Sequence, residues 1–426
     1  MAVVLLVTHG SGGDVLPFVR IGAALAARGH DVSLLTHAPY AARVRAAGLE
    51  FVPIDTEESY PESQVGIDVR SPDELRRHYR KAGLFAQLDA EVAALAERHR
   101  PGATVLVGRH TSALSVLIAA EALGAPAVTV AVAPVQLLVA PAAALNLARG
   151  LADGVGAVRA RHGLPARTDW LRWLGSSART LGLWPRWFDA AGAPAPPGVD
   201  LVGFVTGDDE PATTDDEAAT TDDAKKATTD DAAAAATDGA DRLAGAPLLV
   251  TGGTGAMLHP RFYPLALDAV ARTGHRAVVV APDRALLPAR LPPHTRWYPR
   301  LPFPAVVPRA GALLHHGGIG TAVRALRSGT PQVILAHGAD RPDNAARLAR
   351  FGLARWTDVD RASPELLADL LTTALRRRAR PAGEDPARSS ETAADLIEAT
   401  LTQPPPAPVR ALSAAQKRLL LRKLLR

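Results

Sequence analysis

The chain has no cysteine, only two methionines and few aromatic residues, which make up 4% of its 426 residues. The absence of cysteine excludes disulfides, thiolate nucleophiles and zinc or iron–sulfur centres held by cysteine. No uninterrupted apolar run reaches about 18 residues, the length that a membrane-spanning helix requires. The apolar start of the chain, Ala2–Val7, is short and has no basic residues before it, which is untypical of a signal peptide. We therefore expect a cytoplasmic protein.

Apolar residues, by contrast, account for 47% of the chain. This is enough to build a sizeable core, and the length is typical of two domains. The net charge of +5 is unevenly spread, because residues 207–241 contain twelve acidic residues and two lysines. The basic remainder either attracts anions such as phosphates or serves solubility alone.

Residues 207–241 also differ from the rest in pattern. They contain the sequence Ala-Thr-Thr-Asp-Asp three times and no large apolar residue. Such a segment buries too little surface to offset the loss of chain entropy, so we expect a disordered acidic linker at 207–242. The alternative is a solvated Ala-rich helix, although Asp and Thr are poor helix formers. The linker separates a domain at 1–206 from a second domain at 243–402, and a basic tail follows at 403–426.

Both halves repeat a strand–helix pattern. Ala2–Thr8 is a continuous apolar run typical of a buried strand, and Pro17–Arg28 has helical spacing of apolar residues before Gly29. A long helix is expected at Ala82–Arg98, and after the linker a strand at Pro247–Thr251 opens a second series. Because βαβ units build parallel sheets, the predicted fold class is α/β, with two Rossmann-like domains facing across a cleft.

The first loop of chemical interest, Thr8–Pro17, carries Asp14 among small residues at the start of a helix. A carboxylate there serves either as a helix cap or as a general base facing the cleft. The loop Thr251–Gly255 opens the second half. Its backbone N–H groups and the Thr254 hydroxyl can hold phosphate oxygens, although glycine-rich turns are frequent.

A third loop, at 315–321, has two histidines at a strand end, three glycines and the start of a helix. This combination favours an anion site, and the alternative is that the histidines only cap the strand. No metal is expected, because no third ligand lies at a useful spacing. The fourth loop, Ala336–Asn344, is polar, and it either binds hydroxyl groups or is an ordinary solvated connection.

The 315–344 region resembles the nucleotide-sugar signature of family 1 glycosyltransferases of the GT-B type. The resemblance rests on His315-His316-Gly317-Gly318 and Asp340-Arg341-Pro342-Asp343-Asn344 at the family's spacing, and on the Gly-Ser-x-Gly-Asp-x-x-Pro loop with Arg28-Gly29-His30-Asp31-Val32 after it. Val202-Gly203-Phe204 also resembles the branch that modifies natural products and sterols, in the UDP-glucuronosyl/UDP-glucosyltransferase superfamily. About 350 residues are covered, without the acidic insert and the tail.

The resemblance implies an inverting glycosyltransferase, with roles that carry over by position. Asp14 occupies the place of the family's catalytic base, and Asp340 that of the acid that binds sugar hydroxyls. The first domain would bind the acceptor, and the second the nucleotide sugar. The family's contacts to the leaving diphosphate fall on Thr254, His315, His316, Gly318, Gly320 and Thr321. Which of the two histidines turns inward depends on the strand register, and His316 is the more secure match.

Other positions are matched less closely. Trp297 and Tyr298 stand where the family holds the nucleobase, and Gly12 and His110 are expected on the acceptor side. Arg341 replaces the family's usual Gln. Because Arg cannot accept a hydrogen bond, plain glucose is in doubt, and a deoxygenated or acidic sugar or weak activity is implied instead. The donor, linked to UDP or dTDP, is a co-substrate, and no cofactor is expected.

The implied acceptor is an apolar small molecule, such as a natural product, sterol or lipid, and no nucleic-acid partner is expected. Four tryptophans at 170–187 line its pocket, touch a membrane interface, or simply pack in the core. The tail at 410–426 has six basic residues and no acid, which suggests docking to a synthase or to the inner membrane face, or a frayed end. The alternatives to a transferase are a nucleotide-sugar epimerase of the same fold and a non-catalytic helper of a biosynthetic pathway.

Overall fold

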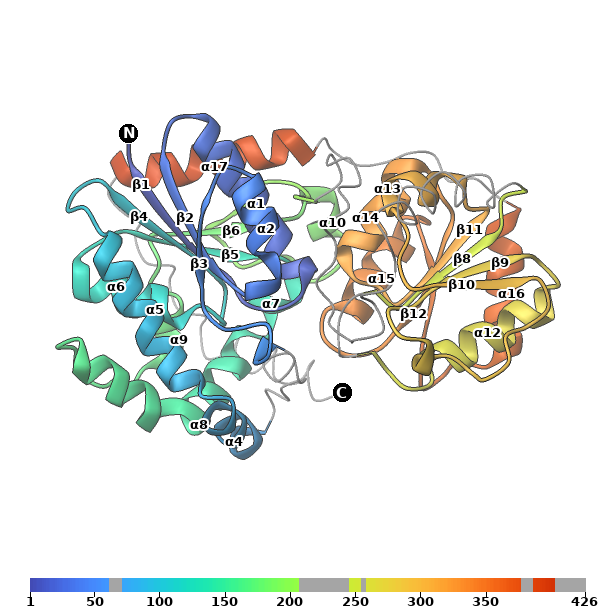
Figure 1. Cartoon of the computed structure of the whole chain (residues 1–426), viewed down its shortest axis with the longest axis horizontal. Helices are drawn as coiled ribbons and strands as arrows, with labels where there is room; N and C mark the ends of the chain where they lie inside the picture. The colour runs from blue at the N-terminus through green and yellow to red at the C-terminus, as the bar shows by residue number, and fades with distance from the viewer. Residues whose placement is uncertain (61–70, 207–244, 254–257, 377–385, 403–426) are drawn as a thin grey trace.

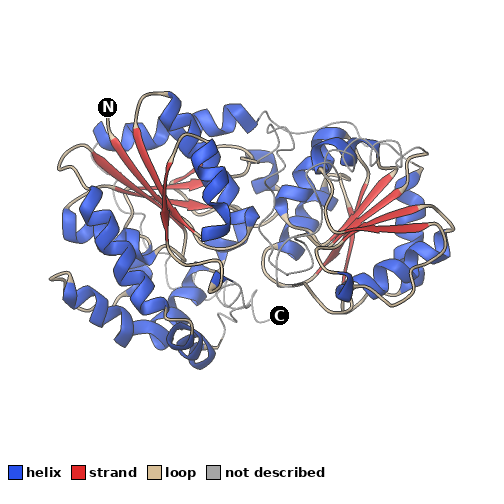
Figure 2. Ribbon diagram, viewed as in Figure 1, coloured by secondary structure: helices blue, strands red, loops and turns tan. Residues whose placement is uncertain are grey.

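The computed structural model describes residues 1–60, 71–206, 245–253, 258–376 and 386–402. It contains two sheets with helices on both faces of each (Figures 1 and 2). The predicted acidic linker, Thr254 and the basic tail lie outside the described residues. Within them, no helix combines the length and the apolar character that a membrane crossing requires.

The first sheet has the strand order β3-β2-β1-β4-β5-β6-β7, and every neighbouring pair is parallel. Both faces of β1 are buried, since Val3, Leu5 and Val7 belong to one hydrophobic cluster and Val4 and Leu6 to another. This is why the strand is a continuous apolar run. The strands are Val3–Val7, Asp31–Thr36, Glu50–Pro53, Thr104–Arg109, Ala127–Ala131, Arg179–Gly182 and Val199–Leu201, for β1 to β7 in order.

Helices cover this sheet in two layers. The bounds are α1 Gly12–Ala27, α2 Ala41–Ala46, α4 Pro72–Lys81, α5 Leu84–Arg98, α6 Leu114–Leu123, α7 Pro134–Leu138, α8 Ala140–Arg161, α9 Trp170–Leu174 and α10 Arg186–Ala190, with a 3₁₀ turn at Ala38–Tyr40. Two of them differ from expectation. α1 begins five residues before Pro17, and the helix predicted from Ala82 is preceded by α4 and begins only after Gly83, whose φ of +66° interrupts the helical backbone.

The second sheet is also parallel throughout, in the order β10-β9-β8-β11-β12-β13. Its strands, β8 to β13, are Leu248–Thr251, Ala277–Val280, Thr295–Tyr298, Ala312–His315, Gln332–Ala336 and Arg355–Asp358. Its helices are α12 Phe262–Thr273, α13 Phe303–Val306, α14 Ile319–Ser328, α15 Arg341–Arg350 and α16 Pro364–Leu375, with 3₁₀ turns at Arg284–Leu286 and Val307–Arg309. Two doubly wound sheets of this kind confirm the predicted fold class.

The last helix, α17 (Pro386–Thr402), returns to the first half of the chain, although the predicted boundary at 402 assigns it to the second domain. It lies along α1 (Figure 1), and Ala393, Ala394 and Ile397 complete the core on that face. Arg28 pairs with Glu391, Asp395 and Glu398 at the surface. The boundary predicted from the sequence did not reveal this contact, because a helical pattern shows that a helix has an apolar face but not which domain that face packs against.

The two halves meet through a shared hydrophobic cluster. Trp184, Phe188 and Phe204 of the first half pack with Val323, Leu326 and Leu348 of the second, and Figure 1 shows α10 beside α14 and α15. Arg347, on α15, is 1% exposed and donates hydrogen bonds to the carbonyl oxygens of Phe188, Asp189 and Ala193 in the first half, at 2.7–3.0 Å. This contact fixes the two domains relative to each other.

Three of the four clustered tryptophans pack in the core. Trp170, Trp173 and Trp184 are at most 4% exposed. Trp187 is half-buried and contacts Phe188, Phe204 and Phe351 edge-on. The core-packing interpretation is thus confirmed for the first three, and Trp187 joins Trp184 in the cluster shared by the two halves.

Candidate functional site

Asp14 is held in the first turn of α1. The helix begins after Ser11, and Asp14 Oδ2 accepts a hydrogen bond from the Ser11 backbone N–H at 3.0 Å. The other oxygen, Oδ1, pairs with the Arg109 guanidinium at 2.8 Å, and both side chains are 19% exposed. The positive end of the helix dipole also favours a carboxylate here. The structure therefore combines the cap with a charged group that keeps some access to solvent.

The backbone beside Asp14 is fixed by close contacts. Gly10 has φ +119°, and a Cβ placed on it would lie 2.4 Å from Asp14 Oδ2, so only glycine fits without moving the carboxylate. The Gly10 N–H donates to His37 Nε2 at 2.9 Å, which leaves Nδ1–H of the neutral ring to donate to Asp55 at 2.6 Å. A buried histidine from the next strand end thus holds the loop in place.

A buried carboxylate supports the same loop. Glu91, on α5, is 3% exposed, and its oxygens contact His9 Nε2 at 2.8 Å, the Ser115 hydroxyl at 2.6 Å and the Gln87 amide at 2.8 Å. Burial alone would raise the pKa of Glu91, but these partners lower it below its ordinary value. The contact between Glu91 and His9 was not predicted from the sequence. The signal that points to Glu91 is an acidic residue inside the buried stripe of Leu88, Val92 and Leu95.

Two tyrosines lie near the Asp14 carboxylate. The hydroxyls of Tyr40 and Tyr60 are 3.3 Å apart. The pKa of each phenol is raised, mainly by burial and in part by the charge of Asp14. Both tyrosines are therefore neutral hydroxyl groups close to the carboxylate. Sequence reasoning did not single them out.

The residue that contacts Asp14 from β4 is Arg109, and His110 follows it. His110 is 6% exposed, and its Nδ1 has no hydrogen-bond partner among the described residues. Burial and the neighbouring Arg109 lower its pKa to about 4, so the ring is neutral. Gly12, the other residue expected on the acceptor side, is the half-buried first residue of α1. The sequence signal for Arg109 is a charged residue at the end of a strand, β4, that is otherwise largely apolar.

The two adjacent histidines at the end of β11 differ in their surroundings. His315 is fully buried, with Nε2 2.9 Å from Gln332 Oε1 and Nδ1 accepting from the Gly317 N–H at 3.2 Å. Burial lowers its pKa to about 4, although the Gln332 contact opposes this. Both ring nitrogens are thus occupied within the protein. His315 holds the loop backbone and has no nitrogen left for a ligand.

His316 is the histidine with a free nitrogen. It is 9% exposed, and its Nδ1 has no hydrogen-bond partner in the described part of the chain. Cβ atoms placed on Gly253 and Gly318 would lie 2.4 Å and 2.5 Å from its ring, so the ring fills the space between two glycine loops. Burial, followed by the charge of Arg341 and the neighbouring His315, lowers its pKa well below the ordinary value. The ring is therefore neutral at pH 7.

The start of α14 lies beside this ring. Gly318 is the N-cap, Gly320 is in the first turn with open space where a Cβ would be, and Thr321 is 8% exposed. A helix N-terminus that presents free backbone N–H groups suits an anion. The structure brings these three residues together with His316.

Asp340 and Arg341 begin α15 at the next strand end. Asn344 Nδ2 donates to Asp340 Oδ2 at 2.8 Å and to the Gly317 carbonyl at 3.2 Å, which ties this loop to the histidine loop. Burial raises the pKa of Asp340, and the charge of Asp14 adds to the increase. The carboxylates of the two domains therefore lie close enough to interact. Arg341 is 7% exposed.

Trp297 and Tyr298 are the last residues of β10, which is the edge strand at the opposite end of the sheet from β12 and β13. Their side chains alternate, so that Trp297 packs toward the α12 face and Tyr298 toward Leu301 and Phe303. The Trp297 indole N–H donates to the Ala281 carbonyl at 2.9 Å, and both rings are half-buried. Two strands, β9 and β8, lie between them and β11, which leads into the His316 loop.

The chain thus has two doubly wound domains, with a fixed carboxylate in the first and a glycine-rich histidine loop in the second. These features are typical of two-domain α/β enzymes that bind anionic ligands. Residues 4–132 match the glycosyltransferase family 28 N-terminal domain. Residues 264–414 match the erythromycin biosynthesis protein CIII-like C-terminal domain. The O-mycaminosyltylonolide 6-deoxyallosyltransferase of Streptomyces fradiae is 30% identical over 93% of this chain and 96% of its own. The chain belongs to the GT-B glycosyltransferases of the family 1-like type, in the antibiotic-biosynthesis branch that uses nucleotide-sugar donors.

Further relatives and structures agree with this assignment. Glycosyltransferase GtfC of Amycolatopsis orientalis is 26% identical over 82% of this chain and 84% of its own. The glycotransferase of kitacinnamycin has a similar structure, with a TM-score of 0.63, 22% identity and coverage of 94% of this chain and 99% of its own. VinC, solved in complex with dTDP, gives a TM-score of 0.60 at 20% identity, over 99% of this chain and all of its own. At these identities the two structures support the fold.

Proposed function

We propose that this glycosyltransferase moves a sugar, with inversion, from a nucleoside diphosphate to a hydroxyl group of an apolar small molecule, with Asp14 as the general base. The observation that carries the proposal is the position of the Asp14 carboxylate in the first turn of α1, where the Ser11 N–H and the Arg109 guanidinium each hold one of its oxygens. The acceptor oxygen attacks the sugar C1, the bond from C1 to the diphosphate oxygen breaks, and Asp14 takes the hydroxyl proton. Attack opposite the leaving group inverts the anomeric centre.

The proposed donor site lies along the second sheet. The leaving diphosphate would be stabilised by the free nitrogen of His316, the backbone N–H groups at Gly318 and Gly320, and the Thr321 hydroxyl. Preorganised hydrogen-bond donors are most effective where negative charge develops in the transition state. Thr254 is proposed as a further contact. Asp340 and Arg341 would hold the sugar, and Trp297 and Tyr298 the nucleobase. No cofactor is needed, because the nucleotide sugar is a co-substrate.

The His316→Ala variant is expected to bind the donor about tenfold more weakly, the loss expected for one hydrogen bond to a charged group. Because the pKa of His316 is lowered well below its ordinary value, its ring stays neutral. Donor affinity of the native enzyme should therefore stay constant between about pH 6 and 8. Calorimetric titration with a UDP-sugar and a dTDP-sugar checks both, because a diphosphate that is esterified at both ends does not titrate in this range, unlike the terminal phosphate of free UDP or dTDP. An affinity that increases as the pH falls through this range would mean that a protonated histidine binds the phosphate.

The Arg341→Gln variant is expected to change the donor preference. The buried guanidinium can only donate hydrogen bonds, whereas Gln also accepts one from a sugar hydroxyl. We expect kcat/KM for UDP-glucose to increase about tenfold relative to deoxygenated and acidic donors. The measurement is initial rates over a panel of UDP- and dTDP-sugars. An unchanged ranking of donors would show that Arg341 does not contact the sugar.

We expect Gly12 and His110, near Asp14, to line the acceptor side of the site. The acceptor itself is proposed to be an apolar natural product, sterol or lipid. The test of the whole proposal is transfer from an α-linked nucleotide sugar to a panel of macrolide and aromatic aglycones, with the product's anomeric configuration determined by NMR. A β-linked product supports inversion, and a retained α-linkage contradicts it. Donor isomerisation without transfer would indicate an epimerase, and donor binding without any turnover a helper protein.

A further inference from the structure

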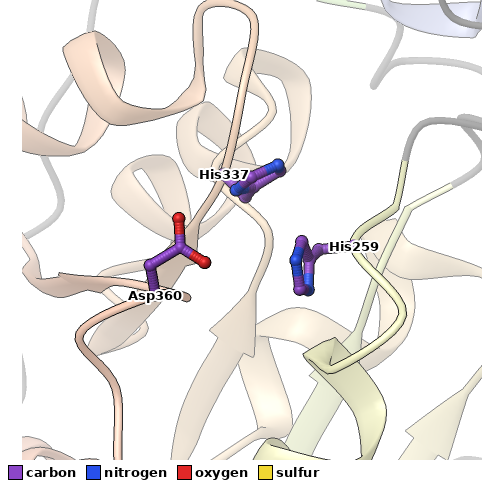
Figure 3. Close-up of side chains that lie close together, drawn as sticks. All are labelled: His259, His337 and Asp360. Carbon is purple, nitrogen blue, oxygen red and sulfur yellow. The ribbon is translucent and has the colours of Figure 1, made fainter.

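Three side chains from separate loops of the second domain point toward one another outside the proposed donor contacts. Figure 3 shows His259, His337 and Asp360 converging. One ligand atom from each lies within 4.8 Å of the other two. The rings of His259 and His337 are 4.5 Å apart between centroids, with their planes at 63°. Two imidazoles and a carboxylate make up a common set of metal ligands.

The parallel sheet explains why residues so far apart in sequence meet. His337 directly follows β12 and Asp360 follows β13, and these strands are neighbours in the sheet. His259 lies on the connection from β8 to α12. All three residues therefore come from connections that leave the same edge of the sheet. This arrangement is invisible to local spacing, and the expectation of no metal site considered only the histidines at 315–316.

We propose that His259, His337 and Asp360 bind a divalent transition-metal ion of the Zn²⁺ class. Nitrogen and carboxylate ligands suit Zn²⁺, Co²⁺ and Ni²⁺, whereas Mg²⁺ and Ca²⁺ favour oxygen ligands alone. The chain has no cysteine, so no thiolate competes for the ion. Exposed Asp360 and half-buried His259 and His337 leave a path from solvent and room for water as a fourth ligand.

The geometry needs only small adjustments. Bonds of about 2.0–2.1 Å in a tetrahedral site place ligand atoms about 3.3 Å apart, which rotation of these side chains can reach from the present spacing. His259 Nδ1 accepts from the Arg261 backbone N–H at 3.1 Å, so the neutral ring carries its proton on Nε2. An ion bound at Nε2 would require the proton to move to Nδ1, and this hydrogen bond would be lost. A bound ion would tie together the β8–α12, β12–α15 and β13–α16 connections.

The experiment uses the full chain with any affinity tag removed and metals stripped by a chelator. ZnCl₂ is titrated by calorimetry and by thermal denaturation, because binding to the native state raises Tm. CoCl₂ is titrated separately, since its visible absorption reports the coordination geometry. We expect one Zn²⁺ per chain, a tetrahedral Co²⁺ spectrum, and no increase in Tm with MgCl₂.

The variants His337→Ala and Asp360→Asn each remove one ligand, and the matched control is His275→Ala, an exposed histidine of the same domain. We expect both ligand variants to bind Zn²⁺ at least about tenfold more weakly and the control to bind as the native chain does. An unchanged Tm in chelator shows that each variant is folded. Absence of Zn²⁺ binding in the native chain, or equal binding in all three variants, would overturn the proposal. Neither result bears on Asp14 or on transfer, so the two proposals fail independently.

Discussion

The Asp14→Asn variant is expected to transfer sugar with a kcat about 10²–10⁴-fold lower than the native enzyme, the usual contribution of a positioned base. Asparagine has nearly the shape of aspartate, and its carbonyl oxygen can still accept from the Ser11 N–H. It cannot take up a proton from the acceptor hydroxyl. Because Asp14 lies in the first domain, away from the proposed diphosphate contacts, donor affinity should change little.

Loss of the ion pair must be separated from loss of the base, since Asp14→Asn removes both. The Arg109→Gln variant removes the pair and leaves the carboxylate. We expect this variant to retain far more activity than Asp14→Asn. The measurements are initial rates at saturating donor, donor titration by calorimetry, and Tm for each variant. Full activity in Asp14→Asn, or equal losses in both variants, would remove Asp14 from the role of base.

The fold could be predicted because its signals are local. β1 is buried on both faces and is therefore apolar throughout, and helices such as α6 and α12 end at glycines with positive φ. The missed elements lack such signals. β6 (Arg179–Gly182) and β7 (Val199–Leu201) are short strands, one of them at the sheet edge, and the polar residues within them obscure the pattern.

The site was predictable only where its residues follow strand ends in recognisable loops, as Asp14, His316 and Asp340 do. Arg109, Glu91 and Tyr40 reach the same region through contacts between distant parts of the chain, which no spacing reveals. The two histidines at 315 and 316 illustrate the limit. Their order in the chain is plain, but only the structure distinguishes the one bonded to Gln332 from the one with a free nitrogen.

The Arg347→Ala variant is expected to destabilise the protein by about 3–5 kcal/mol, because it removes buried hydrogen bonds from a charged donor, worth about 1.5–3 kcal/mol each, and leaves a cavity. Arg347 is 1% exposed and pairs with Asp343 at 2.7 Å on its own helix, while its other donors bond to three carbonyl groups of the first domain. Removing the guanidinium leaves Asp343 unpaired and a cavity between the domains. A cavity and lost donors at this contact should also weaken the coupling between the domains.

Differential scanning calorimetry checks this expectation, with Arg350→Ala as the matched control. Arg350 lies one turn further along α15, is exposed, and makes a single hydrogen bond, 3.4 Å in length, to the first domain. We expect Arg347→Ala to lower Tm by several degrees and to separate the unfolding of the two domains, while Arg350→Ala changes stability by less than about 0.5 kcal/mol. Similar Tm values for the two variants would show that the apolar cluster of Trp184, Phe188 and Leu348 holds the domains together without the buried arginine.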